Sequence, residues 1–223
     1  MADFRSHLSV AAVGGALAAY SGWQVGLWSL VEASPLAALV AFGGILPDID
    51  ADHSRAIRLL FTLFAVLAVI AGVLLMQSRL SPGELVAACG GLYVGVRYGA
   101  GALFKRFTVH RGIWHSLLAG GLCGLVVTVL GYRLFEQGAS QAWWQGLALF
   151  AGVVIHLLLD EMYSVDLTGA RIKRSFGTAL KLCDLREPGN SVVMLMAGAT
   201  LIPWLPPWST LWGVLSQGVA AWR

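Results

Sequence analysis

The sequence predicts an all-α membrane protein, a polytopic transmembrane helical bundle. Hydrophobic residues make up 57% of the chain and charged residues only 12%, whereas soluble domains carry about 25% charged residues. The mean hydropathy is +0.73, and several uncharged runs are long enough to cross a hydrocarbon core of roughly 30 Å. We therefore expect about six to eight membrane segments, including short or interfacial ones, within a single domain spanning residues 1–223.

The expected spans follow one another with short polar turns between them. The first runs from Leu8 to Val31, and its glycines permit the close helix contacts common in membranes. A short second span begins near Pro35, which is tolerated in a first turn, and ends at Leu46. The remaining spans of this core are expected at about residues 59–77, 85–104, 117–132 and 142–160. Together they form a predicted core bundle over residues 1–165.

The composition becomes more polar after Asp160. Residues 166–190 form a predicted basic cytoplasmic segment at the membrane surface, and residues 191–223 form an apolar segment rich in tryptophan. Tryptophan favours the membrane interface, but the sequence leaves open whether this last segment crosses the membrane. At the other end, Asp3 precedes the first apolar run and no signal-like cleavage site follows, so we expect that run to be retained.

His156 and Asp160 are the most informative residues of the chain. They lie four residues apart, so on a helix they share one face with about 5–6 Å between their Cβ atoms. The run before them is uncharged, and an ionisable group in a membrane span needs a partner. The spacing suits two ligands of one metal ion, although a hydrogen-bonded pair that joins two helices is an alternative.

The predicted topology brings further ligand candidates to the same membrane face. All five histidines of the chain fall on that side, together with Asp48, Asp50 and Asp160. Most lysines and arginines lie there too, so the positive-inside rule makes this face cytoplasmic. His53 is an exception in the cluster, because a solvated loop residue is an equally good reading of it.

Imidazole and carboxylate ligands without thiolates favour zinc, manganese or iron. The three scattered cysteines indicate neither a disulfide framework nor a thiolate zinc site. The number of candidates exceeds what one tetrahedral ion needs, so we expect two divalent ions, most simply Zn²⁺, about 3.5–4 Å apart. Such a pair suits phosphate-ester hydrolysis by a metal-activated hydroxide. Ser116 is expected to be a helix-start hydroxyl rather than a nucleophile.

A family resemblance rests on four features that occur in order: a histidine just before the first span, then LPDID, HRGIWHS and HLLLD. Over roughly residues 1–165 the chain resembles the YdjM-like family of LexA-regulated, inner-membrane metal-dependent hydrolases of bacteria. That family is distantly similar to zinc-dependent phospholipase C and to fungal single-strand nucleases. The resemblance implies hydrolysis of phosphate esters, and by motif it implies these metal ligands: His7, Asp48, Asp50, His110, His115, His156 and Asp160.

We therefore expect a multi-pass protein of the bacterial inner membrane that hydrolyses a phospholipid or another lipid phosphate at the cytoplasmic face. Asp48, Asp160 and Arg111 are the expected catalytic residues, and Arg111, Arg171, Lys173 and Arg174 are candidates for binding phosphate. The expected partners are the lipid bilayer and the substrate, with no stable nucleic-acid partner. Two alternatives stay open, a divalent metal transporter that uses the same cluster and a non-catalytic scaffold. A transporter usually places its ion site near the bilayer midplane, with access from both sides.

Overall fold

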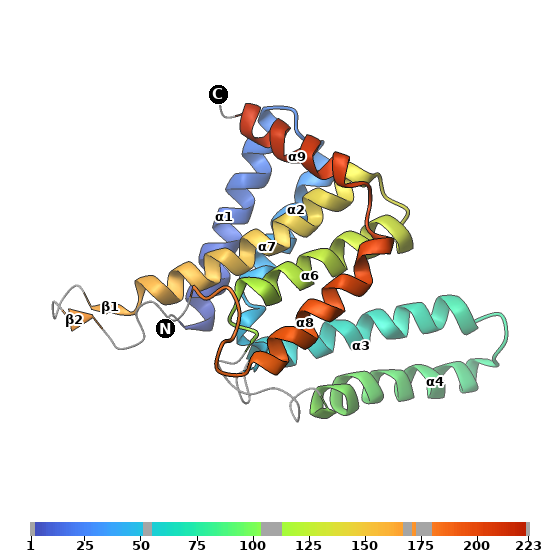
Figure 1. Cartoon of the computed structure of the whole chain (residues 1–223). Coiled ribbons are helices and arrows are strands. Elements are labelled where there is room, and N and C mark those ends of the chain that lie inside the picture. Colours follow the sequence, from blue (N-terminus) through green and yellow to red (C-terminus); the bar gives the residue numbers. More distant parts are fainter. Residues whose placement is uncertain (1–2, 51–54, 104–112, 167–170, 173–179, 222–223) are drawn as a thin grey trace. The chain divides into compact units, whose positions relative to one another are not determined.

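The computed structural model of the chain describes residues 3–50, 55–103, 113–166, 171–172 and 180–221 (Figure 1). The chain divides into two compact units, one made of Met1–Pro47 with Ile113–Arg223 and the other of Asp48–Gly112. Each unit is described by itself. The prediction that residues 1–223 form a single domain therefore stays a prediction.

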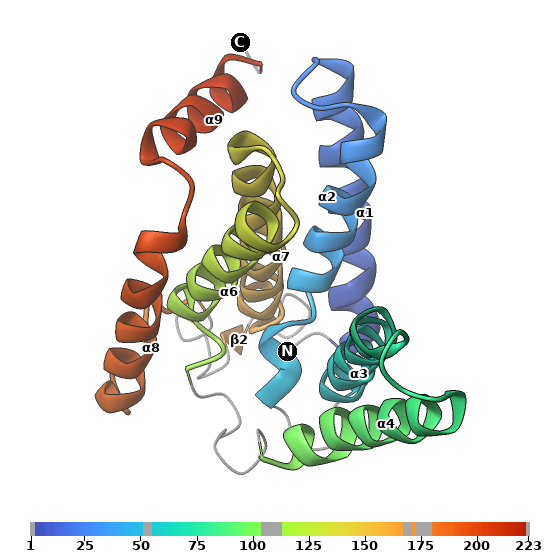
Figure 2. The same ribbon diagram turned by 90° about the vertical axis from the view of Figure 1, so that its right-hand side faces the viewer.

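The larger unit is a bundle arranged around one long central helix, α7. Its helices are α1 (Phe4–Gln24), α2 (Leu30–Gly43), α6 (Leu117–Val129), α7 (Ala139–Met162), α8 (Pro188–Leu201) and α9 (Trp208–Ala220). Helix α7 packs against α1, α2, α6 and α9, while α8 packs against α6. Figure 2 shows α6 and α7 between the α1–α2 pair on one side and α8 on the other.

Short non-α segments complete the larger unit. A π-helical turn, Leu130–Leu134, extends α6, and a 3₁₀ turn, Ile202–Trp204, follows α8. Strand β1 (Val165–Asp166) pairs with β2 (Arg171–Ile172) in an antiparallel arrangement. The prediction of an all-α protein is therefore confirmed, apart from this pair of two-residue strands.

The first helix ends earlier than the sequence predicted, at Gln24 rather than at Val31. Gly26 adopts a positive φ of 76°, a left-handed conformation that turns the chain. The indole of Trp28 then folds back, and its Nε1–H donates to the Ala19 carbonyl at 2.8 Å. The ring occupies the space where a Cβ at Gly22 would lie, 2.0 Å from the nearest ring atom. An uncharged run concealed this turn, because no charge marks it.

The second helix begins earlier than predicted, at Leu30, because Ser29 and Glu32 form a capping box. This start places Pro35 in the second helical turn rather than the first, which corrects the prediction. Proline has no N–H to donate to the carbonyl one turn back, and the hydroxyl of Ser34 donates to that Val31 carbonyl instead, at 3.2 Å. The local hydrogen bond lets the helix continue through the proline.

The smaller unit is a helical hairpin. It consists of α3 (Arg55–Met76), α4 (Pro82–Val94) and a π-helical segment, Gly95–Ala100, that continues α4 and packs against α3. The predicted turn at Ser81 is confirmed: the Ser81 hydroxyl caps α4, and the Glu84 side chain accepts the Ser81 N–H at 2.9 Å.

Within the described residues, three helices are long and apolar enough to cross a membrane: Ile57–Met76, Leu117–Leu134 and Ala139–Met162. A fourth candidate is the pair Pro188–Trp204 and Trp208–Ala220, which is bent by 98°. This count is lower than the predicted six to eight. Helix α2 is too short, at 14 residues, and small and polar residues lower the mean hydropathy of α1. The bend of this pair lies at Pro206 and Pro207, which have no N–H to continue a helix.

We expect a topology reporter fused just after α7 to be cytoplasmic and one at Ser81, between α3 and α4, to be periplasmic. The physical reason is the concentration of lysine and arginine on one predicted face, which orients spans by the positive-inside rule. A paired phosphatase and fluorescent-protein reporter would measure both positions. Two reporters on the same side would contradict the predicted orientation.

Candidate metal centre

Three buried side chains from α1 and α7 converge in the larger unit. The Nε2 atom of His7 lies 3.2 Å from Oδ1 of Asp160, and Nε2 of His156 lies 3.8 Å from Oδ2 of the same carboxylate. The residues are only 1%, 0% and 3% exposed for His7, His156 and Asp160, respectively. One ligand atom from each lies within 4.8 Å of the others.

All three side chains come from the ends of helices α1 and α7. His7 lies at the start of α1, whose first turn is capped by Asp3 accepting the Ser6 N–H at 2.8 Å. His156 and Asp160 lie near the end of α7, and their i,i+4 spacing places both on one face, as the sequence predicted. The imidazoles of His7 and His156 stack with centroids 3.7 Å apart and planes 13° apart.

The cluster fits a metal ion. Two donor atoms at about 2.0–2.2 Å from a tetrahedral zinc ion lie roughly 3.4 Å apart, which is close to the two observed contacts of 3.2 and 3.8 Å. Both ring nitrogens of His7 are buried and make no hydrogen bond of good geometry among the described residues. The buried His and Asp groups could therefore hold a metal ion.

The tautomer of His156 is determined by a backbone contact. Its Nδ1 lies 2.7 Å from the carbonyl oxygen of Gly44. A carbonyl only accepts hydrogen bonds, so Nδ1 carries the hydrogen and donates. In the neutral ring Nε2 is then the lone-pair nitrogen, and it is the atom that faces Asp160. Metal-binding histidines are commonly oriented in this way by a second hydrogen bond.

Glycines bring Gly44 this close to His156. A Cβ at Gly152 would lie 2.1 Å from the Val40 carbonyl oxygen, and one at Gly43 would lie 2.2 Å from the Leu149 carbonyl oxygen. Helices α2 and α7 thus touch backbone to backbone, one helical turn from His156. Small residues at such contacts are typical of helices packed in membranes.

His115 lies beside the cluster, at the start of α6. Its ring centroid is 5.5 Å from that of His156, with the planes 66° apart, and the residue is 4% exposed. The next residue, Ser116, caps α6 by accepting the Ala119 N–H, and its hydroxyl donates to the Ile113 carbonyl. The prediction that Ser116 is a helix-start hydroxyl is confirmed, and this cap holds His115 in place.

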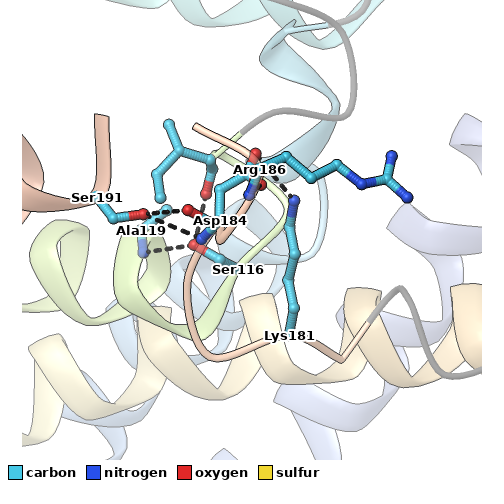
Figure 3. A network of polar contacts seen from close by, with 7 residues as sticks. Ser116, Ala119, Lys181, Asp184, Arg186 and Ser191 are labelled. Atoms are coloured by element: carbon cyan, nitrogen blue, oxygen red, sulfur yellow. Dashed lines mark hydrogen bonds and ion pairs between the residues drawn. The ribbon is translucent and has the colours of Figure 1, made fainter. Parts of the chain in front are cut away.

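A segment after α7 returns to cover this start of α6 (Figure 3). The first two N–H groups of α6, from Leu117 and Leu118, donate to the carbonyls of Lys181 and Leu182. Nearby, Lys181 Nζ lies 3.3 Å from Oδ2 of Asp184, and the backbone of Asp184 is bonded to the hydroxyl of Ser191.

Other predicted ligands belong to different parts of the chain. Asp48 and Asp50 lie in the 3₁₀ turn Pro47–Asp50 and begin the smaller unit. Their roles as ligands stay predictions.

Several predicted residues lie outside the described part of the chain, or have side chains that do. His53, His110, Arg111, Lys173 and Arg174 lie outside it, and only the backbone of Arg171 is described, in β2. Sequence reasoning also missed one member of the site, Gly44. Any residue offers a carbonyl, so no side-chain pattern identified its role.

Comparisons with known proteins give one match. The family model described as YdjM inner membrane protein matches residues 1–173. The searches of curated proteins and of solved structures found no match. The matched range contains His7, His115, His156 and Asp160.

We expect His156→Ala and Asp160→Ala each to lower the metal bound per protein by at least half while the protein stays in the membrane. Each change removes one of three converging donors, and Asp160 contacts both imidazoles. Elemental analysis of purified protein would measure this. Asp184→Asn is the matched control, because Asp184 is also buried but lies outside the cluster. Full occupancy in a double His156/Asp160 variant would show that the cluster is only structural.

A second expectation concerns the α2–α7 contact. Gly152→Ala should lower the metal content. It should also lower the free energy of unfolding by about 1–3 kcal/mol, as overpacking does. Gly14→Ala is the control, because a Cβ there meets only Ile155 Cδ1 at 3.4 Å. Thermal unfolding in detergent and elemental analysis test the pair. Equal values for the two variants would contradict a role for the backbone contact.

Proposed function

The chain belongs to the family of YdjM inner membrane proteins, and from this premise we propose that it is a membrane-embedded, metal-dependent hydrolase of phosphate esters. The observation that carries the proposal is the convergence of His7, His156 and Asp160, all buried, in a protein of apolar helices. Such a set of donors is costly to bury without a ligand that uses it.

A bound divalent ion would supply Lewis-acid polarisation of a phosphoryl oxygen and would lower the pKa of a coordinated water. His7, His156 and Asp160 would hold an ion. Asp48, Asp50, His110 and His115 remain the other proposed metal ligands, and two ions remain the proposed number. Zn²⁺ suits these nitrogen and oxygen donors, as do Mn²⁺ and Fe²⁺.

The side chains described around the cluster have definable roles in this proposal. The Gly44 carbonyl keeps the lone pair of His156 on Nε2, and the Asp160 carboxylate lies against both imidazoles. The close packing of α1, α2 and α7 excludes bulk water from these groups. Arg111, Arg171, Lys173 and Arg174 remain the proposed phosphate-binding residues, because guanidinium and ammonium groups suit phosphate.

The location of the cluster along the helices favours an enzyme over a transporter. His7 lies in the first turn of α1, and Asp160 lies in the last turn of α7. Transporters bind their ions near the bilayer midplane, often at breaks within helices. The broken pair α8–α9 contributes no residue to the three-residue cluster. We therefore propose a site near one membrane face, the cytoplasmic one, and a lipid phosphate as substrate.

In nanodiscs, the wild-type protein should release phosphate or a phosphorylated headgroup from a lipid phosphate without any ion gradient. Asp160→Asn should lower turnover by more than about 100-fold, beyond the 10–100-fold typical of losing a supporting residue. Asp48→Asn should also lose turnover, because it removes an anionic ligand. A phosphate-release assay over a panel of phospholipids and polyprenyl phosphates would measure these rates.

Glu136→Gln serves as the control in this assay, because Glu136 is exposed and lies beyond the end of α6 that is away from His115. A chelator should abolish wild-type turnover until zinc is restored. The result against the proposal is also defined. If metal-loaded protein hydrolyses no member of the panel, while sealed proteoliposomes containing it accumulate zinc or manganese, the protein is a transporter.

A further inference from the structure

An apolar groove of about 770 Å³ lies in the larger unit, between α6, α7 and α8, with α9 at one end. Leucines of α6 such as Leu117 and Leu125 form one wall, Phe150 of α7 forms another, and Met194 and Ala199 of α8 form the third. The hydroxyl of Thr128, which also lines the groove, is already bonded to the Gly124 carbonyl at 3.0 Å. Most of the other lining side chains are apolar, so the groove offers mainly apolar surface.

The length of the groove matches one leaflet of a bilayer. Its lining runs along α6 from Leu117 to Thr128, which spans about 16 Å at 1.5 Å per residue. The hydrocarbon core of a bilayer is about 30 Å thick, so one leaflet contributes about 15 Å. A lipid chain that lies in one leaflet has the length of this groove.

The groove has room for a hydrocarbon chain. Its volume of about 770 Å³ lies within the roughly 300–1,000 Å³ typical of sites that bind small molecules, and its lining is almost wholly apolar. A helix of a second copy is the competing occupant, and the experiment below distinguishes the two.

One end of the groove lies next to the metal cluster. Leu117, which lines that end, follows Ser116 and His115, and the His115 ring is 5.5 Å from that of His156. The Lys181–Leu182 segment is bonded to the same helix start. Lys181 is paired with Asp184 there, and the guanidinium of Arg186 is exposed nearby (Figure 3). A lipid with its chain in the groove would have its headgroup at this end.

We propose that the α6–α7–α8 groove binds a hydrocarbon chain of a membrane lipid whose phosphate headgroup lies at the His115 end. That this lipid is the substrate rests on the proposed hydrolase function. Binding of the lipid's hydrocarbon chain does not rest on the hydrolase function, because this binding needs neither metal nor turnover.

Glycines on the groove provide a way to test it. A Cβ at Gly121 would meet nothing within 4 Å, so a leucine there would project into the groove without displacing a helix. Gly213 of α9 has equally open space and similar burial but does not line the groove. Gly121→Leu and Gly213→Leu therefore form a matched pair.

The experiment uses nanodiscs that contain a phospholipid with a photoactivatable diazirine in its acyl chain, and mass spectrometry maps the labelled peptides. In the wild type, labels should fall on residues 117–128 of α6 and on α8. Gly121→Leu should lower this labelling at least fivefold and leave the metal content unchanged, while Gly213→Leu should stay within twofold of the wild type. Should Gly121→Leu fail to fold, Gly198→Leu replaces it, because its Cβ meets only leucine methyls at 3.9 and 4.0 Å.

Equal labelling of the two variants, or labels confined to other helices, would overturn the groove proposal. A dimer seen by native mass spectrometry that Gly121→Leu dissolves, with no loss of lipid label, would also overturn it. The failure of the hydrolase proposal gives a different result. If Gly121→Leu removes the lipid label but the wild-type protein hydrolyses no lipid phosphate, the groove proposal is supported and the hydrolase proposal is refuted. A raised KM in Gly121→Leu with kcat unchanged supports both.

Discussion

The candidate metal centre depends on the contact of α2 with α7 at Gly43 and Gly152. The two backbones touch there, since any Cβ at either glycine would overlap a carbonyl oxygen of the other helix. This approach brings the Gly44 carbonyl to 2.7 Å from Nδ1 of His156. The hydrogen bond then decides which nitrogen of His156 carries the lone pair, and so which atom faces Asp160. Packing of small residues therefore controls the chemistry of a histidine.

Burial of His7, His156 and Asp160 costs free energy unless other groups compensate for the lost water. Taking a carboxylate out of water costs several kcal/mol unless opposite charge and hydrogen bonds compensate. Asp160 has two imidazoles against it, each able to share a positively charged ligand with it. A divalent cation would compensate the burial of all three groups at once. For this reason we propose a bound metal ion at the cluster rather than a pair that only joins two helices.

The candidate metal centre and the apolar groove come from different parts of the chain. His7, His115, His156 and Asp160 lie within residues 1–173, which match the family model. The α8 wall of the groove lies beyond that range, at Pro188–Leu201. The two are connected at the start of α6, where Ser116 caps the helix and the Lys181–Leu182 backbone accepts its first N–H groups. The C-terminal helices thus add a wall of the apolar groove to the region that matches the family model.

The sequence by itself determined the local features of this protein. Uncharged runs predicted the three helices that are long and apolar enough to cross a membrane, but also predicted further spans that the structure does not bear out. The i,i+4 spacing placed His156 and Asp160 on one face, and serine and glutamate marked the start of α4. Each of these depends on residues within about one or two helical turns. Tertiary structure alone decided the close approach of His7, the role of Gly44, the early end of α1 under Trp28, and the docking of Lys181 on α6. These depend on contacts between residues far apart in the chain, and the glycines and backbone carbonyls that make them carry no side-chain signal in a sequence.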